Sequence, residues 1–340
     1  MVFWKGRSAA VSDLVHASKI SLSKALSKAF DRAGHADVAR LGLIALMALL
    51  LVVPLGAGGF LLYSLSLCFA NALAVLSVSV LVRYGGEVSI GHSFFVALGA
   101  YTVAIVERRL GLSVAASLPL ATLLGAGAGF VFAFPSRRLS GIYLAVATMA
   151  LALALPELLV GFDKFTGGFE GLYIARDLIP GVSKALQRYY LAFALLCVAC
   201  FALAQFRRSP QGMALLMARD QPRAAEAMGI TGSWARISVF TLSAALAALA
   251  GALLGFTSST VSPNSFSFWS GVFLLVGSVV SLNGLSLPAA LVGGVFITLV
   301  PTYLAHAGDW VPILYGVALI AVTLVANVGG LRRWLPGGRG

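Results

Sequence analysis

The sequence predicts an all-α, polytopic membrane protein with about ten transmembrane helices. Of its 340 residues, 59% are hydrophobic and only 11% are charged, whereas about 25% of the residues of soluble domains are charged. Apolar runs of about 20 residues recur along the chain, which is the length an α-helix needs to cross the hydrocarbon core. A transmembrane β-barrel would instead show short segments of alternating hydrophobicity.

The expected helices are ten apolar segments, at about 41–61, 63–82, 89–106, 112–134, 139–160, 189–206, 234–256, 266–282, 285–305 and 310–329. Pro54 and the run GAGG at 56–59 loosen the first boundary, so the first two segments are candidates for a broken pair. The segments at 89–106 and 266–282 are short enough to be discontinuous or re-entrant. Residues 41–330 are therefore expected to form a transmembrane domain, and 331–340 a cytoplasmic tail.

Residues 1–40 contain seven basic side chains, and their apolar residues recur at helical spacing. This pattern is typical of a basic amphipathic helix on an anionic membrane surface. A loosely ordered cytoplasmic extension is the alternative. We do not expect a cleaved signal peptide, because the apolar run starts only at residue 41 and is too long for one.

The basic residues predict the orientation of the chain. The net charge is +12, and the bases lie between the apolar runs, which favours the positive-inside rule over nucleic-acid binding. With the N-terminus inside and ten crossings, inside segments contain 18 basic residues and outside segments contain six. Both termini and residues 207–235 are then cytoplasmic, and the loop 161–188 is outside. The run ERR at 107–109 is the one cluster that fits poorly.

The chain lacks the motifs of the common enzyme classes. It contains no GxxxxGK[ST] phosphate loop, no HExxH and no GxSxG, and its four histidines are dispersed. Its three cysteines lie inside apolar runs, and CVAC at 197–200 has no second pair nearby. We therefore predict no catalytic residues, no metal site and no cofactor in this chain. Transport driven from elsewhere is favoured over an intramembrane enzyme.

Polar residues within the spans are few and mark a candidate translocation path. Glu87 and His92 lie in the glycine-rich stretch 84–101, where a broken helix would expose backbone N–H groups to a polar or anionic solute. The alternative is that Glu87 pairs with Arg83 at the membrane interface and His92 is a satisfied interior residue. With Glu157, these two residues would also be the coupling groups of a secondary transporter, the alternative function.

Three other features have two interpretations each. Thr148 either lines a path or bonds back to its own helix, and Asn283 faces either a turn or a cavity. The loop TGGFEGLYI at 166–174 is either a plain turn or an outer docking or gate element. Its candidate residues are Thr166, Gly167, Gly168, Glu170 and Gly171.

The segment SPQGMALLMARDQPRAAEAMGI at 209–230 is too charged to span a membrane. Ser209 is a good N-cap with Pro210 at the first helical position, and Gly229 is a plausible C-cap. Asp220 is expected to start a second short helix, with Pro222 in its first turn. The segment is either an interfacial helix pair or a docking site for a cytoplasmic partner.

Four stretches, in register, resemble the LivM-type permeases of ATP-binding cassette importers. GGEVSIGHSFFVALGAY, which includes Tyr101, is similar to the family's Gly-Gln-x-Ser-x-Gly-His segment and following Gly-Ala-Tyr. LSGIYLAVATMA is similar to its Arg-Gly-x-Tyr-x-Ala-x-Ala-Thr helix, and TGGFEGL to its Thr-Gly-Gly-x-Asp-Gly-Leu loop. The segment 209–230 is similar to its Ser-Pro-x-Gly-Arg-Ala…Ala-Ala-Glu-x-x-Gly-Ile motif.

The resemblance implies the fold of type II importer permeases and an inner-membrane location. It implies a LivH-like second permease, two cytoplasmic ATPases that bind ATP and Mg²⁺, and a periplasmic binding protein. Branched-chain amino acids or related small polar solutes would be transported. The residues expected to couple to an ATPase are Ser209, Pro210, Gly212, Arg219, Asp220, Arg223, Ala225, Glu226 and Gly229.

The chain departs from the family pattern at several positions. Glu87 replaces the usual Gln, Met213 replaces Arg, and Pro222 interrupts a smoother helix. The turn at Asn283 and Gly284 is shortened, and the family's acid after Thr148 corresponds to a position near Leu153. These changes bear more on the identity of the solute than on the permease assignment.

Overall fold

The computed structural model describes residues 42–137, 139, 141–175, 178–179, 181–303, 313, 316–317 and 320–321. The extension 1–40, the tail 331–340 and most of the last apolar segment lie outside the described residues. The chain divides into two units, residues 1–57 and 58–340. In the first unit, a helix at Gly42–Val52 is followed by the 3₁₀ turn η1 (Val53–Leu55). Helical structure stops at 56–58, where Pro54 and the glycines predicted a break.

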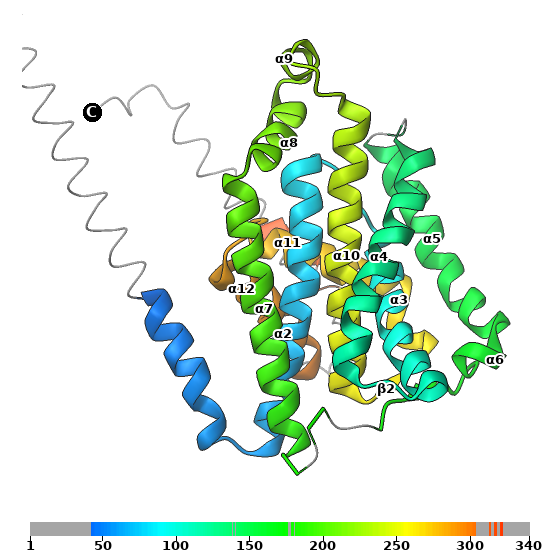
Figure 1. Ribbon diagram of the computed structural model, residues 1–340, viewed down its shortest axis with the longest axis vertical. Coiled ribbons are helices and arrows are strands. Elements are labelled where there is room, and N and C mark those ends of the chain that lie inside the picture. The colour runs from blue at the N-terminus through cyan, green and yellow to red at the C-terminus, as the bar shows by residue number, and fades with distance from the viewer. Residues whose placement is uncertain are drawn as a thin grey trace, which may run out of the picture. The chain divides into compact units, whose positions relative to one another are not determined.

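The second unit is built almost entirely of helices (Figure 1). Its elements are α2 (Gly59–Val80) with the π-helical turn η2 (Leu81–Gly85), α3 (His92–Ile105) with the π-helical turn η3 (Val106–Leu110), α4 (Val114–Ser136), α5 (Ile142–Gly161), α6 (Asp163–Thr166), β1 (Leu172–Tyr173), α7 (Lys184–Arg208), α8 (Pro210–Asp220), α9 (Pro222–Ala227), α10 (Gly232–Ser258), β2 (Thr260–Val261), the 3₁₀ turn η4 (Pro263–Phe266), α11 (Phe268–Val280) and α12 (Leu287–Tyr303). Among the described residues, five helical segments are long and apolar enough to cross a bilayer, and shorter apolar helices accompany them. The predicted all-α polytopic class is confirmed.

Helix α10 forms the centre of the second unit and packs against α2, α3 and α4 (Figure 1). Glycines allow the backbones to approach closely. A Cβ atom on Gly99 would lie 1.8 Å from the carbonyl oxygen of Ala248, and one on Gly251 would lie 1.8 Å from that of Val96. Small residues at helix crossings are the usual means of tight packing in membranes.

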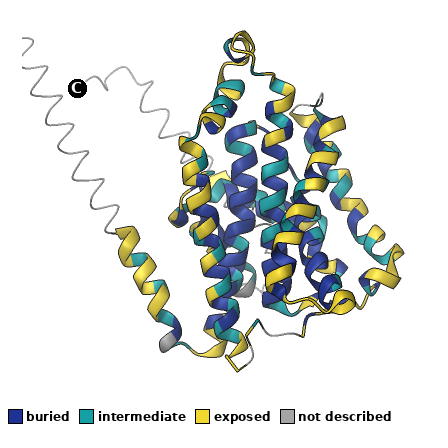
Figure 2. Cartoon of the chain, in the orientation of Figure 1, coloured by how far each residue is buried: buried dark blue, intermediate teal, exposed yellow. Residues whose placement is uncertain are grey.

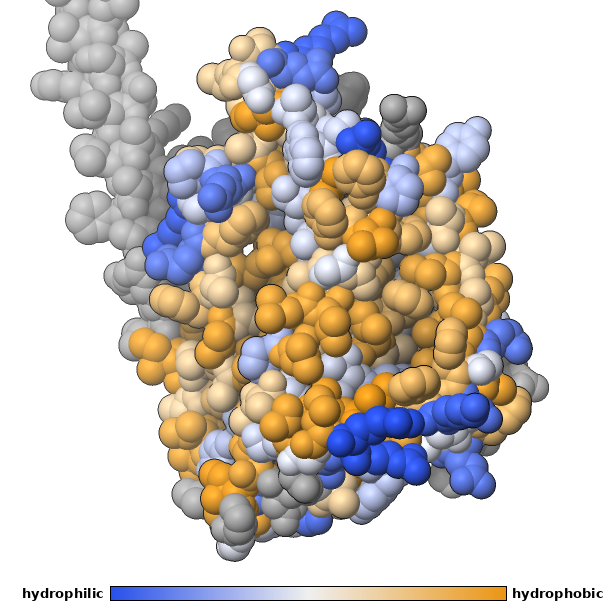
Figure 3. Space-filling model, turned by 45° about the vertical axis from the view of Figure 1, so that its right-hand side comes forward, coloured by the Kyte–Doolittle hydropathy of each residue, from blue (hydrophilic) through white to orange (hydrophobic). Residues whose placement is uncertain are grey.

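The outer helices expose long apolar surfaces (Figure 2). Only 22% of the most apolar window of α5 is buried, against 78% of that of the α2–η2 segment. Figure 3 shows a broad hydrophobic belt with hydrophilic side chains gathered at its two ends. This distribution is the one expected of a multi-pass membrane protein.

The two ends of the second unit differ. Helices α8 and α9 lie at one end, and α6 with the short sheet lies at the other (Figure 1). In this sheet β1 pairs antiparallel with β2, with Leu172 opposite Val261 and Tyr173 opposite Thr260. The loop 161–188 is therefore tied to the end of α10, and it contains α6, β1 and the first turn of α7.

Candidate functional site

The glycine-rich stretch 84–101 contains a break between two helices, as predicted. The π-helical turn η2 ends at Gly85, Gly86 adopts the left-handed conformation with φ +66°, and α3 begins at His92. The five residues between, 87–91, form no helix. We refer to residues 86–91 as the break segment.

The break segment is wedged between α5 and α11. The backbone N–H of Ile90 donates to Thr148 Oγ1 at 3.2 Å, and a Cβ on Gly91 would lie 2.0 Å from the carbonyl oxygen of Thr148. On the other side, a Cβ on Gly271 would lie 2.1 Å from the carbonyl oxygen of Ile90. Thr148 also donates to Ala145 O at 3.0 Å. Its hydroxyl therefore bonds both to its own helix and to the break segment.

Glu87 is 8% exposed and pairs with Arg236, with 3.4 Å between Oε1 and Nε. The expected alternative partner, Arg83, instead offers its carbonyl oxygen to Arg219. Burial raises the pKa of the Glu87 carboxyl, and the Arg236 guanidinium opposes part of that rise. Glu87 therefore links the break segment to the start of α10.

His92 is fully buried at the first turn of α3. Its Nε2 lies 2.8 Å from Ser243 Oγ, and Ser243 donates to the carbonyl oxygen of Ser77 at 2.7 Å. This network joins α3, α10 and α2. The geometry is that of the predicted satisfied interior residue, although Nδ1 has no partner within the described residues.

Tyr101 and Asn283 lie apart from this network. Tyr101 is 3% exposed, and its ring centroid is 6.4 Å from that of Phe266. Asn283 lies in the turn between α11 and α12 with φ +51°, and its Oδ1 accepts from Ser278 Oγ at 2.7 Å. Of its two interpretations, the turn is the one this geometry matches. The five predicted path residues are thus distributed over several contacts.

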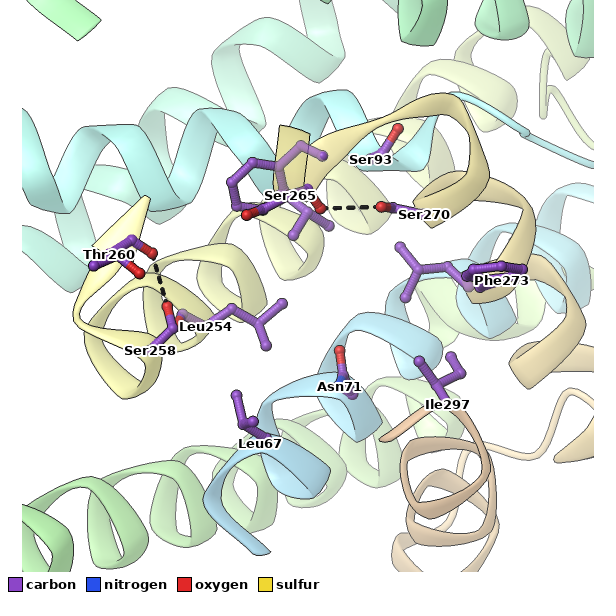
Figure 4. Close-up of a pocket in the computed structure, with 13 residues that line it drawn as sticks. Leu67, Asn71, Ser93, Leu254, Ser258, Thr260, Ser265, Ser270, Phe273 and Ile297 are labelled. Atoms are coloured by element: carbon purple, nitrogen blue, oxygen red, sulfur yellow. Dashed lines mark hydrogen bonds between the residues drawn. The ribbon is translucent and has the colours of Figure 1, made fainter. Parts of the chain in front are cut away.

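A cavity of about 270 Å³, shown in Figure 4, is lined by Ser93, which lies two residues after the break segment. It is lined by side chains from α2, α3, α10, β2, η4, α11 and α12, namely Leu67, Asn71, Ser93, Val96, Leu254, Ser258, Thr260, Ser265, Phe266, Ser270, Phe273, Leu274 and Ile297. None of the five predicted path residues lines it. Two internal hydrogen bonds order its wall: Ser258 donates to Thr260 O at 2.9 Å, and Ser270 to Ser265 O at 3.0 Å.

Asn71 is the cavity residue that the sequence analysis missed. Its Nδ2 donates to Thr298 Oγ1 at 2.9 Å, and its side-chain oxygen points into the cavity (Figure 4). It is the only amide side chain in the apolar run 63–82, and this isolation was an available signal.

The cavity suits a small neutral or zwitterionic solute. Its polar groups are hydroxyls, one amide and backbone, and none of its lining residues carries a charge. Neither Glu87, His92 nor Glu157, the groups that a secondary transporter would use, contributes to it. Ion-coupled transport therefore gains no support from this wall.

The segment 209–230 forms two short helices, α8 and α9. Ser209 caps α8 by accepting from the Gly212 N–H at 3.1 Å, with Pro210 at the first helical position, as predicted. Asp220 was expected to start the second helix, and this is wrong, because Asp220 is the last residue of α8. The chain breaks at Gln221, which leaves the helical conformation (φ −138°, ψ 70°) since it precedes Pro222. Gly229, with φ +82°, follows α9 as the expected cap.

Helix α8 touches the break segment directly. Arg219 Nη1 donates to the carbonyl oxygen of Arg83 at 2.5 Å, and its side chain covers Gly86, where a Cβ would lie 3.2 Å from Nε. A second cavity, of about 510 Å³, lies between α8, α9, η2 and the start of α10, and Arg219, Glu226 and Arg236 line it.

Most of the remaining predicted coupling residues are exposed. Ala225 is buried beneath α9, whereas Asp220, Arg223 and Glu226 are exposed. Two methionines are also exposed, Met213 by 57% and Met228 by 71%. Exposed methionines are frequent on surfaces that bind other proteins.

The loop at 166–174 is stabilised by its threonine and glycines. Buried Thr166 donates to the carbonyl oxygen of Leu159 at 2.5 Å and accepts from the Gly168 N–H at 3.3 Å. A Cβ on Gly171 would lie 2.1 Å from the carbonyl oxygen of Val261. Gly167 closes on Gly171 in the same way, and Glu170 is exposed. The loop is therefore a compact turn that rests on β2, whose Thr260 lines the smaller cavity.

Comparison with known proteins identifies the family. Residues 60–326 match the family described as branched-chain amino acid transport system / permease component. The LivM proteins of Salmonella typhimurium and Escherichia coli, named high-affinity branched-chain amino acid transport system permease proteins, are each 30% identical over 236 residues. That alignment covers 62% of this chain and 55% of each LivM protein.

A probable branched-chain amino acid transport permease protein LivH of Methanocaldococcus jannaschii is 23% identical over 283 residues, 77% of this chain and 88% of the LivH protein. The chain thus spans about half the length of the two LivM proteins. No solved structure matches it. The match to residues 60–326 covers most of the chain, and the family is one of transport components rather than enzymes. The chain belongs to the branched-chain amino acid transport permease family, as its resemblance to LivM-type permeases indicated.

Proposed function

We propose that this chain is a permease subunit of an ATP-driven importer for branched-chain amino acids or a related small polar solute. A LivH-like permease would complete the pathway, two cytoplasmic ATPases would bind ATP and Mg²⁺, and a periplasmic binding protein would deliver solute. The family match and the names of the relatives support this assignment. We further propose a bacterial inner-membrane location with both termini cytoplasmic, which the distribution of basic residues favours.

One observation carries the mechanism: a continuous series of contacts runs from α8 to the smaller cavity. Arg219 contacts Arg83 and Gly86 at the start of the break segment. At the other end of that segment, Ile90 packs on Gly271, which also adjoins the hydroxyl of Ser93. Ser93 and Ser270 line the cavity. A displacement of α8 would therefore reach the cavity wall through the break segment and would not have to be transmitted along a long helix.

The break segment is suited to transmit such motion. Residues 87–91 form no helix, so no helical hydrogen bonds within them must break. The first residue of the segment, Gly86, has the conformational freedom of a glycine. The cavity of about 510 Å³ beneath α8 and α9 leaves room for these helices to approach the bundle. We infer that an ATPase docked on Met213, Arg223 and Met228 closes this space during its cycle.

Two substitutions separate docking from transmission. Met213→Glu places a charge at an exposed apolar side chain of α8 and is expected to abolish co-purification of the partner ATPases. Gln211→Glu is the matched control, because it adds the same charge about 200° away around the same helix. Arg219→Met removes the bond to Arg83 while keeping an unbranched side chain. It should leave co-purification intact and abolish the stimulation of ATP hydrolysis by solute-loaded binding protein.

The two readouts can contradict the proposal independently. Unchanged co-purification with Met213→Glu would exclude α8 as the docking surface. Full stimulation in a vesicle-reconstituted Arg219→Met complex would exclude the contact series from Arg219 as the route of coupling.

A further inference from the structure

The run ERR at 107–109 is the cluster that the charge distribution left unexplained, and the structure places it in a concave site. Arg108 and Arg109 lie in η3, which directly continues α3, at the end of the bundle opposite α8 (Figure 1). They line a cavity of about 340 Å³ together with Lys164 and Phe165 of α6. Three cations and one aromatic ring thus come from two segments that are far apart in sequence.

Arg109 connects the two segments that form the site. Its guanidinium donates to the carbonyl oxygen of Lys164 and lies 4.7 Å from the centroid of the Phe165 ring. These contacts tie η3 to α6 and fix the spacing between the basic side chains. By contrast, within the described part of the chain, the Arg108 guanidinium and the Lys164 ammonium have no hydrogen bond or ion pair.

The two nearby carboxylates are directed elsewhere. Glu107 is 8% exposed, and its Oε1 accepts from the Ala175 N–H at 2.9 Å. Asp163 Oδ1 accepts from the backbone N–H of Lys164 at 2.6 Å. Among the described residues, no acid lines the cavity, so its lining is positively charged and complementary to an anion.

The surroundings of the site are apolar. Leu110 is 64% exposed and Phe162 is 62% exposed, and each lies within two residues of a cation in this site. Both segments follow directly on apolar helices, α3 and α5. A phosphate with acyl chains attached can satisfy both the cations and these exposed apolar side chains, whereas an acidic protein surface would leave the apolar side chains unpaired.

We propose that Arg108, Arg109 and Lys164 bind the phosphate of an anionic phospholipid headgroup, with Phe165 and the adjoining apolar side chains contacting its chains. The site would anchor this end of α3 and α5 at the membrane interface. It also explains basic residues on the side of the membrane where the positive-inside rule disfavours them. The proposal depends on the membrane setting alone and not on the transported solute.

The test is lipid retention by the full chain, measured by native mass spectrometry after exposure to phosphatidylglycerol or phosphatidylcholine. The unaltered chain should retain phosphatidylglycerol preferentially. The double variant Arg108→Gln, Lys164→Gln should lose about fivefold in retention for each cation removed. The control is Arg208→Gln, which removes an exposed charge at the last residue of α7, away from this site. It should leave retention unchanged.

Any of the following results would overturn the proposal. The double variant could retain phosphatidylglycerol as well as the unaltered chain does, or Arg208→Gln could reduce retention equally. Displacement of the lipid by inorganic phosphate alone would assign the site to a free anion, and a loss of binding-protein docking with unchanged lipid retention would assign it to an acidic protein. If the double variant fails to fold, retention by the unaltered chain must still fall as ionic strength rises, and no salt dependence would also refute the site.

Discussion

Glu87 is a carboxylate whose burial and ion pair act in opposite directions. Its pKa in the folded chain is raised above the ordinary value of 4.5, because burial outweighs the Arg236 guanidinium. The folded state therefore binds this proton more tightly than the unfolded state does. The stability contributed by Glu87 is fully present at low pH and is lost as pH rises from about 4.5 through the raised pKa.

Replacing Glu87 with Gln should remove this pH dependence. The melting temperature of Glu87→Gln relative to the original chain should rise across that pH window and then level off. The corresponding relative gain in the free energy of unfolding is no more than about 1.4 kcal/mol per pH unit. Thermal unfolding of the detergent-solubilised chain at a series of pH values measures it. Glu170→Gln, at an exposed site, controls for the loss of a carboxylate. A relative gain by the original chain as pH rises would mean that the Arg236 pair outweighs burial.

Single residues were predictable where their partners are local. The cap at Ser209 bonds three residues ahead, so the sequence alone predicted it. The partner of Glu87 was not predictable, because the neighbouring Arg83 and the distant Arg236 are equally basic and only the packing of α10 decides between them. Asn71 was missed for a similar reason: its place in a candidate site depends on a cavity that is lined by seven elements distant in sequence.

At the scale of elements, the break segment depends on close backbone contact with α5. A methyl group at position 91 would lie 2.0 Å from the carbonyl oxygen and 2.7 Å from the carbonyl carbon of Thr148. Neither is the end of a flexible side chain, so the segment or α5 must move. Gly91→Ala should therefore destabilise the chain by about 1–3 kcal/mol, the range of overpacking in a dense interior.

The matched control for Gly91→Ala is Gly127→Ala. Gly127 lies in α4 with nothing within 4 Å of an added Cβ, so alanine should be neutral or stabilise by up to about 1 kcal/mol. Thermal unfolding of both variants, with solute uptake as a second readout, compares them. Equal effects of the two substitutions would mean that Gly91 is not held against Thr148 in the membrane.

The existence of the helices was predictable, and their breaks were predictable only in part. Long apolar runs specify α4, α5, α7 and α10 closely, because length and hydrophobicity are local properties. The position of the break between α8 and α9 was misjudged by one residue. Aspartate is common at the start of a helix, which favoured Asp220. The position of the break was instead determined by the restriction that Pro222 imposes on Gln221.

For the whole molecule, the arrangement of helices could not be predicted from apolar segments alone. The alanine and glycine content of α10 indicates close packing, but not that α2, α3 and α4 are its neighbours. The orientation in the membrane rests on the asymmetry of basic residues, 18 on one side against six on the other. The structure adds that the segments assigned to opposite sides, α8–α9 and the loop with β1, lie at opposite ends of the second unit (Figure 1).

This orientation predicts which positions react with a membrane-impermeant maleimide in intact cells. A cysteine replacing Glu170, which is exposed in the outer loop, should be labelled without permeabilisation. A cysteine replacing Arg223, exposed in α9, should be labelled only after the membrane is opened, in a chain expressed without the ATPases that would cover this position. The native thiols give little background, since Cys68 and Cys200 are buried and Cys197 is half-buried within apolar helices. If only Arg223→Cys were labelled in intact cells, the orientation would be the opposite of the predicted one. The charged face of α8 and α9 would then lie where no cytoplasmic ATPase could reach it.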